Sequence, residues 1–171
     1  MRQIIIDTET TGLNARGGDR IVEIGAIELI NHVPTGRTYQ VYINPERDMP
    51  AEAERVHGIS AAFLADKPVF AAIVDEFLAF VGDAPLVAHN AGFDIGFVNA
   101  ELERIGRAML PTDRTIDTVE LARRKFPGAQ ASLDALCRRF QIDTTHRTKH
   151  GALLDAELLA KVYLELVGGR E

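Results

Sequence analysis

The fold is decided by residues 2–30, which read RQIIIDTETTGLNARGGDRIVEIGAIELI. Residues 2–7 form an apolar run that ends in an acid, which predicts a buried strand. Turn-forming residues follow over 8–18. Residues 20–30 then alternate with period two, which predicts a second strand. One face of that strand is predicted to carry Ile21, Glu23, Gly25, Ile27 and Leu29.

A third strand is predicted over residues 38–44, with Gly36 in the hairpin link before it. Three consecutive strands predict an antiparallel meander. Beyond the third strand, apolar residues recur at helical spacing. Helices are predicted over 70–81, 93–105, 117–125, 132–140 and 151–167, and short strands over 85–89 and 115–116. Strands first, then alternating helices and strands, predict an α/β fold with a mixed sheet, in one domain spanning residues 1–171.

The composition is that of an ordinary globular protein, 46% hydrophobic and 26% charged. No apolar run approaches the roughly 18–20 residues that cross a bilayer. Cys137 is the single cysteine, and there is no signal segment, so we expect a cytoplasmic protein without a membrane partner. The net charge of −6 argues against a protein that coats long nucleic acid. It does not exclude an enzyme that holds only a strand end and meets the phosphate charge with metal ions.

Four acids stand where acids are unexpected. Asp7 and Glu9 follow the first predicted strand, and residues i and i+2 of an extended segment point to the same side. Asp94 and Asp155 each lie on the apolar stripe of a predicted helix, where a charge is costly unless it is paired or bound to a metal. Simpler readings stay open for some of them: Asp7 capping a turn, a solvated Glu9, and Asp94 favoured by the helix dipole.

If these four carboxylates converge, their repulsion requires cations. Oxygen ligands suit Mg²⁺ or Mn²⁺, and two divalent ions would balance four carboxylates. Such a pair can activate a water and stabilise the leaving oxygen of a phosphodiester. His150, five residues before Asp155, is a candidate general base for that water. The alternative for His150 is a solvated loop histidine.

Three segments at this point resemble a known family: IIDTETTG at 5–12, HNAGFD at 89–94 and HGALLDA at 150–156. They are similar to the three motifs of the DEDD superfamily of 3′–5′ exonucleases, histidine variant, and within it to the proofreading epsilon subunits of bacterial DNA polymerase III. The resemblance extends through VHGI at 56–59 and SLDALC at 132–137. It implies an RNase H-like fold with a five-stranded mixed sheet flanked by helices.

The resemblance also implies roles for individual residues. Asp7, Glu9, Asp94 and Asp155 would hold two divalent cations, Mg²⁺ or Mn²⁺, with His150 as the general base. Residues that would bind the terminal nucleotide are Thr8, Thr10, Thr11, Gly12, Glu52, His57, Asn90 and Phe93. For Glu52 and His57 the alternatives are a solvated helix acid and a loop histidine. The loop over 14–19, beside this pocket, is shorter than in family members, so the grip on substrate is expected to differ.

The expected function is therefore removal of mononucleotides from single-stranded or frayed DNA 3′ ends by two-metal-ion hydrolysis, in proofreading during replication. The expected partner in the full-length family context is the polymerase subunit of DNA polymerase III. Family members continue with a polymerase-binding tail; here Gly168 and Gly169 end the last predicted helix, so a domain without that tail, monomeric alone, is expected. Two alternatives remain. One is an RNA-trimming or oligonucleotide-degrading member of the superfamily, and the other is an inactive scaffold or DNA-binding subunit.

Overall fold

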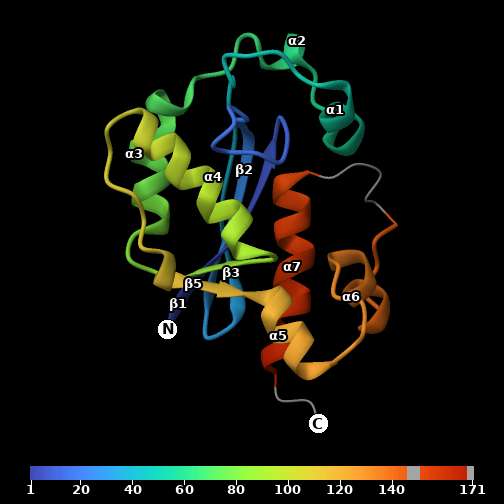
Figure 1. Cartoon of the computed structure of the whole chain (residues 1–171). Coiled ribbons are helices and arrows are strands. Elements are labelled where there is room, and N and C mark those ends of the chain that lie inside the picture. Colours follow the sequence, from blue (N-terminus) through green and yellow to red (C-terminus); the bar gives the residue numbers. More distant parts are fainter. Residues whose placement is uncertain (146–150, 169–171) are drawn as a thin grey trace.

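A computed structural model describes residues 1–145 and 151–168 of the chain. Its centre is a five-stranded sheet in the order β3-β2-β1-β4-β5 (Figure 1). The strands are β1 (Arg2–Thr10), β2 (Ile21–Ile30), β3 (Val33–Tyr42), β4 (Leu86–Ala88) and β5 (Thr115–Asp117). The first three strands pair antiparallel, whereas β4 is parallel to β1 and β5 is parallel to β4. The predicted meander and mixed sheet are confirmed.

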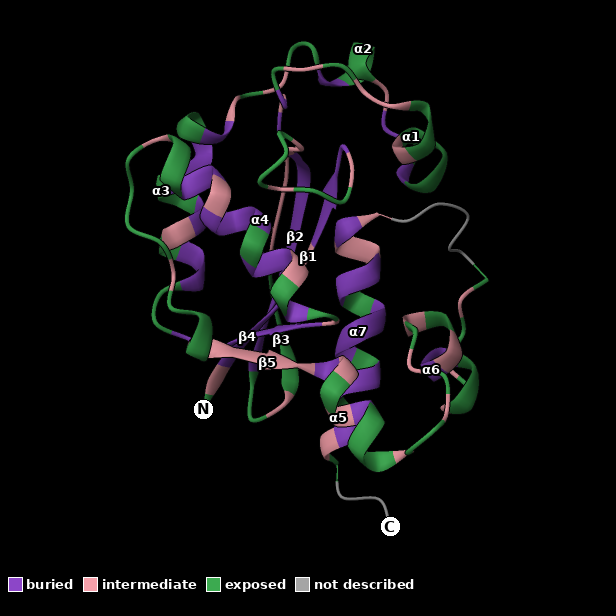
Figure 2. Cartoon of the chain, in the orientation of Figure 1, coloured by how far each residue is buried: buried purple, intermediate pink, exposed green. Residues whose placement is uncertain are grey.

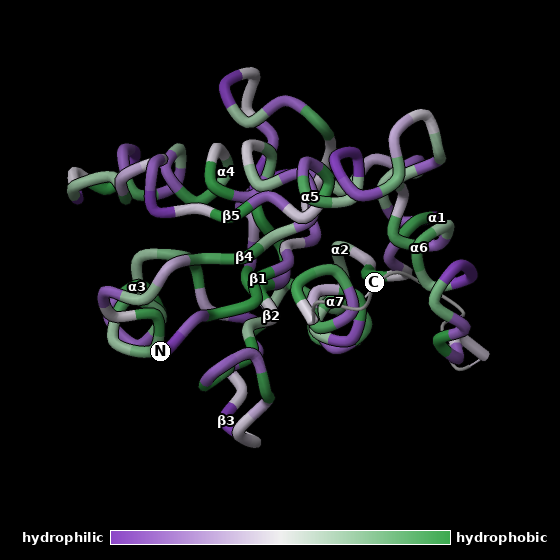
Figure 3. Tube along the Cα trace, turned by 90° about the horizontal axis from the view of Figure 1, so that it is seen from below, coloured by the Kyte–Doolittle hydropathy of each residue, from purple (hydrophilic) through white to green (hydrophobic). Residues whose placement is uncertain are grey.

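Helices cover both faces of the sheet. They are α1 (Ala51–His57), α2 (Ala61–Leu64), α3 (Phe70–Val81), α4 (Ala91–Arg104), α5 (Thr118–Lys125), α6 (Leu133–Arg139) and α7 (Ala152–Val167), with a 3-10 turn η1 (Thr112–Arg114). Seen from below, α3 and α7 lie on opposite sides of the sheet (Figure 3). Each of the described helices is too short or too polar to cross a membrane. Two short helices, α1 and α2, and the turn η1 were not predicted.

The sheet separates two hydrophobic clusters. One packs α3 and α4 against the sheet face that carries Ile4 and Ile6, and the other packs α5, α6 and α7 against the face that carries Ile5 and Ile27. Buried residues therefore concentrate on the central strands and along α7 (Figure 2). Cys137 on α6 belongs to the second cluster and is 1% exposed. The alternation of odd and even residues in β1 decides which cluster each side chain joins.

Three sequence expectations near the meander were wrong in detail. β1 continues through Thr10, so residues 8–10 are strand and not turn. β3 begins at Val33, and Gly36 lies inside it at a bulge, with φ of 96°. The hairpin link is instead Asn31 and His32, both with left-handed φ (51° and 71°). Such a two-residue turn needs positive φ at both positions, which glycine signals more clearly than histidine does.

Candidate active site

Three of the four predicted acids converge where β1 meets the start of α7. Asp7 and Glu9 lie on the same side of β1, and Asp155 lies in the first turn of α7. Each offers a carboxylate oxygen, and these oxygens lie within 4.8 Å of one another. Glu9 and Asp155 are buried, with 8% and 5% exposure, and Asp7 is half-buried. Such a cluster of oxygen donors suits a hard divalent cation.

Asp94 reaches β1 from the other side of the sheet. It lies in the first turn of α4 and is buried. Its Oδ1 accepts hydrogen bonds from the Thr8 backbone N–H at 3.1 Å and from Thr8 Oγ1 at 2.7 Å. Its carboxylate therefore lies beside the group formed by Asp7, Glu9 and Asp155. Asp94 is thereby tied to the strand between Asp7 and Glu9, and its charge acts on Asp7 together with those of Glu9 and Asp155.

The electrostatics of this cluster call for a counter-charge. Burial raises the pKa of Asp7 well above its ordinary value, and the charges of Asp94, Glu9 and Asp155 raise it further. Burial also raises the pKa of Asp94 to about 7, although the hydrogen bonds from Thr8 act in the opposite direction. Among the described residues, the buried Oδ2 of Asp7 has no hydrogen-bond partner. A buried carboxylate oxygen that has no hydrogen-bond donor and lies beside two other carboxylates is suited to bind a cation.

A cavity of about 180 Å³ opens beside the acids. Five of the residues predicted to bind the terminal nucleotide line it, together with Glu9, Leu13, Ala53 and Val56: they are Thr8, Thr10, Gly12, His57 and Phe93. Leu13, Ala53 and Val56 were missed, because they are apolar residues in a loop and in the unpredicted helix α1. Leu13 is 86% exposed at the mouth of this cavity.

His57 contributes to this cavity as a fixed wall. It is 6% exposed, which excludes the solvated loop histidine. The Ile59 backbone N–H donates to its Nδ1 at 3.0 Å, and its Nε2 lies 3.1 Å from the Thr10 carbonyl oxygen. Because Nδ1 accepts, Nε2 carries the proton and donates to Thr10. Both ring nitrogens are thus occupied by backbone groups, and the ring ties α1 to the end of β1.

The remaining predicted nucleotide contacts lie in neighbouring hollows. Thr11 and Glu52 line a second cavity of about 450 Å³, which shares Gly12, Leu13, Ala53 and Val56 with the first. Glu52 is exposed on α1. Asn90 lines a third cavity, of about 680 Å³, which none of the four acids lines. Asn90 has a left-handed backbone (φ 69°), and its N–H donates to Asp117, the capping residue of α5. His150 lies outside the described residues.

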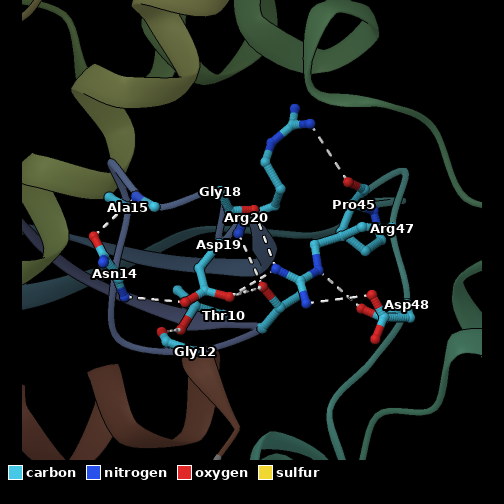
Figure 4. A network of polar contacts seen from close by, with 12 residues as sticks. Thr10, Gly12, Asn14, Ala15, Gly18, Asp19, Arg20, Pro45, Arg47 and Asp48 are labelled. Carbon is cyan, nitrogen blue, oxygen red and sulfur yellow. Dashed lines mark hydrogen bonds and ion pairs between the residues drawn. The ribbon is translucent and has the colours of Figure 1, made fainter.

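The loop that carries Gly12 is held by one carboxylate, that of Asp19 (Figure 4). Asp19 accepts from Thr11 Oγ1 at 2.9 Å, from the Asn14 N–H at 3.1 Å and from Arg47 Nη1 at 2.8 Å. A side chain at Gly12 would collide with it, since an added Cβ would lie 2.7 Å from Asp19 Cγ. The short loop beside the pocket is therefore a closed, hydrogen-bonded structure.

The chain matches known exonucleases over nearly all of its length. A family model described as exonuclease (RNase T) matches residues 4–163. DNA polymerase III subunit epsilon of Rickettsia conorii is 58% identical over 174 residues, which cover 100% of this chain and 76% of the relative. The corresponding protein of Escherichia coli K12 is 49% identical over 176 residues, which cover 99% of this chain and 72% of the relative.

Solved structures agree on the fold. Exonuclease X in complex with 5′ overhanging duplex DNA has a TM-score of 0.73 at 28% identity, covering 97% of this chain and 91% of that one. The nuclease domain of 3′hExo, a DEDDh family member bound to rAMP, has a TM-score of 0.84 at 18% identity, covering 98% and 92%. The latter is a likeness of fold alone. The chain belongs to the exonuclease family and, within it, to the epsilon subunits of bacterial DNA polymerase III, the 3′–5′ proofreading exonucleases.

Proposed function

We propose that this chain removes mononucleotides from DNA 3′ ends during replication, with Asp7, Glu9, Asp94 and Asp155 as ligands of two divalent cations, Mg²⁺ or Mn²⁺. The observation that carries the proposal is the group of three carboxylates within 4.8 Å of one another, next to a fourth on Asp94. When bound, the cations would activate a water and stabilise the leaving oxygen of the phosphodiester.

The residues of the chain have separable tasks in this proposal. Asp7, Glu9, Asp94 and Asp155 would hold the cations, and Thr8 fixes the Asp94 carboxylate through two hydrogen bonds. The 180 Å³ cavity beside Glu9 receives the terminal nucleotide, between the Thr10–Gly12 segment and Phe93. His57 keeps the end of β1 in place through Thr10. His150 takes the proton from the attacking water, the role that its position before Asp155 suggests.

The biological setting follows from the relatives. Because they are named as subunits of DNA polymerase III, the proposed partner is the polymerase subunit of that enzyme, and the proposed location is the cytoplasm. The two large hydrophobic clusters share one sheet, which supports residues 1–171 as one catalytic domain; that it is monomeric alone is part of the proposal. The high identity with epsilon subunits favours DNA over RNA as substrate, and a single-stranded or frayed end over a paired one.

The test uses end-labelled single-stranded DNA, matched RNA of the same sequence, and duplexes with paired or mismatched 3′ termini. With Mn²⁺ or Mg²⁺ we expect a ladder of products shortened from the 3′ end, with DNA cut faster than RNA and mismatched termini faster than paired ones. A paired end must first melt, at a cost of a few kcal/mol. Cleavage that persists in excess chelator would exclude the metal-dependent mechanism, and faster cleavage of RNA would replace proofreading by RNA trimming.

A further inference from the structure

A further buried acid, Glu23, lies beside the catalytic cluster, and the proposed chemistry does not use it. It is 4% exposed on β2, directly opposite Glu9 of β1. Both of its oxygens are occupied: Oε1 accepts from the Ala152 backbone N–H at 3.0 Å, and Oε2 accepts from Gln40 Nε2 at 2.8 Å. Glu23 therefore bonds to protein groups and has the character of a support for the cation ligands.

The bond to Ala152 places Glu23 at the start of the helix that carries Asp155. Ala152 is the first residue of α7, and Asp155 follows three residues later, within the first turn. The first N–H groups of a helix have no partner inside the helix and need an external acceptor. A carboxylate there is also favoured by the helix dipole. Among the described residues, Gly151 supplies no side-chain cap, so the acceptor for this turn comes from the sheet.

Gly25, two residues further along the same face of β2, is the second contact of the sheet with this first turn of α7. A Cβ at Gly25 would lie 2.5 Å from the carbonyl carbon of Ala152 and 2.6 Å from the Cα of Leu153. The backbone of α7 thus rests directly on the backbone of β2. Contact at Gly25 fixes how close the helix comes to the sheet, and the bond to Glu23 fixes where its first turn lies along β2.

We propose that Glu23 is a positioning residue: through the Ala152 N–H it holds the first turn of α7 so that the Asp155 carboxylate stays within cation-binding distance of Asp7 and Glu9. The inference rests on the proposed function of those three acids. Reach matters more than charge in this role, because the bond to Ala152 needs an acceptor at the position of Oε1. Two conservative variants separate these properties. Glu23→Asp keeps the charge and withdraws the acceptor by one methylene, whereas Glu23→Gln keeps the reach and removes the charge.

The matched controls are Glu28→Asp and Glu28→Gln. Glu28 is a second buried acid of β2, 6% exposed, which accepts from Arg2, Thr35 and Arg37 at the opposite end of the strand. Each full-length variant is measured for Mn²⁺ affinity by electron paramagnetic resonance, for kcat and KM on a short single-stranded DNA, and for urea unfolding. The Glu28 variants show how much a general loss of stability alone changes the Mn²⁺ affinity and kcat.

We expect Glu23→Asp to weaken Mn²⁺ binding and to lower kcat by about 10- to 100-fold, the usual effect of removing a support of a metal ligand, with KM almost unchanged. Glu23→Gln should stay close to the wild type in both measurements, because its carbonyl oxygen still accepts from Ala152 and the Gln40 amide can turn. The Glu28 variants should keep wild-type Mn²⁺ affinity and kcat.

Wild-type Mn²⁺ affinity in Glu23→Asp would overturn the inference, as would a defect in Glu23→Gln as large as that in Glu23→Asp, or an equal loss in the Glu28 variants. The Mn²⁺ measurement does not need activity, so failure of the two proposals can be told apart. A wild-type chain that binds Mn²⁺ but cleaves no DNA would contradict the proposed function and leave the comparison of Glu23 variants interpretable.

Discussion

The two helices that deliver acids to the site, α4 and α7, are fastened to the sheet in different ways. A side-chain ion pair fastens α4: Arg20, the residue before β2, donates to both oxygens of Glu101 at 2.9 and 2.7 Å, and the Ile21 N–H adds a third bond. Backbone contact fastens α7, at Gly25, with Glu23 accepting from its first turn. The anchor of α4 lies seven residues beyond Asp94, whereas the anchor of α7 lies within one turn of Asp155. Damage to the first should mainly affect stability, and damage to the second should mainly affect chemistry.

The largest expected effect is loss of activity when either helix loses its acid. Asp94→Ala and Asp155→Ala should each lower kcat by roughly 10⁴-fold or more, as for members of a group that acts as a unit. Their stabilities without metal should differ. Asp155→Ala relieves repulsion with Asp7 and Glu9 and should unfold at the same or a higher urea concentration. Asp94→Ala also removes a charge that acts on Asp7, but it leaves the buried Thr8 N–H without its acceptor and should cost about 1–3 kcal/mol. Equal urea midpoints for the two variants would remove this distinction between the helices.

The second effect tests the ion pair of α4. Glu101 is buried, with 1% of its side chain exposed, and Arg20 retains 17%. Glu101→Ala leaves the Arg20 charge without its partner and should cost about 3–5 kcal/mol in urea unfolding. Below the unfolding transition, kcat should stay close to that of the wild type. The control is Glu103→Ala on the same helix, whose exposed pair with Arg16 at 3.5 Å contributes at most about 1 kcal/mol. A large loss of kcat in folded Glu101→Ala would mean that this anchor also positions Asp94.

The third effect is the pH dependence of the metal-free protein. The folded-state pKa of Asp94, about 7, lies above its ordinary value of 3.8, and the pKa of Asp7 is raised as well. Between these pH values the folded chain binds more protons than the unfolded chain, so stability should fall as the pH rises toward 7. Mn²⁺ should abolish this loss, and Asp94→Asn should reduce it. Thermal unfolding in chelator that is independent of pH over this window would contradict the raised pKa values.

The smallest effect is expected for two glycine substitutions, one at Gly25 of β2, which contacts α7, and one at Gly96 within α4. Gly25→Ala forces a methyl group into the first turn of α7 and should cost about 1–3 kcal/mol as overpacking, together with a fall in kcat because Asp155 moves. Gly96→Ala on α4 meets no atom within 4 Å. It should stabilise the helix by up to about 1 kcal/mol and leave kcat unchanged. Equal unfolding free energies for the two variants would show that α7 does not need the close approach at Gly25.

Sequence patterns predicted the elements that have strong periodicity or clear caps. The α3 prediction matches to the residue, and Asp117 and Ser132 cap α5 and α6 as expected. The acids of β1, α4 and α7 could be singled out because a charge interrupts each apolar run. Glu23 could not be singled out, although its face of β2 was predicted correctly. Its proposed role depends on a hydrogen bond from Ala152, which is 129 residues away in the sequence. His57 was placed at the pocket through the family resemblance, but the two bonds that fix its ring could not be predicted, since they depend on a backbone carbonyl of β1 and on the short helix α1.

The buried thiol of Cys137 can serve as a natural probe of local unfolding around α6 and α7. Its thiol is packed among residues of α7 and the neighbouring sheet face, so a thiol reagent can reach it only when that packing opens. The labelling rate under native conditions therefore measures the free energy of that opening, without any introduced probe. Followed with and without Mn²⁺, this rate would tell whether metal binding at one end of α7 tightens the whole helix or only its first turn.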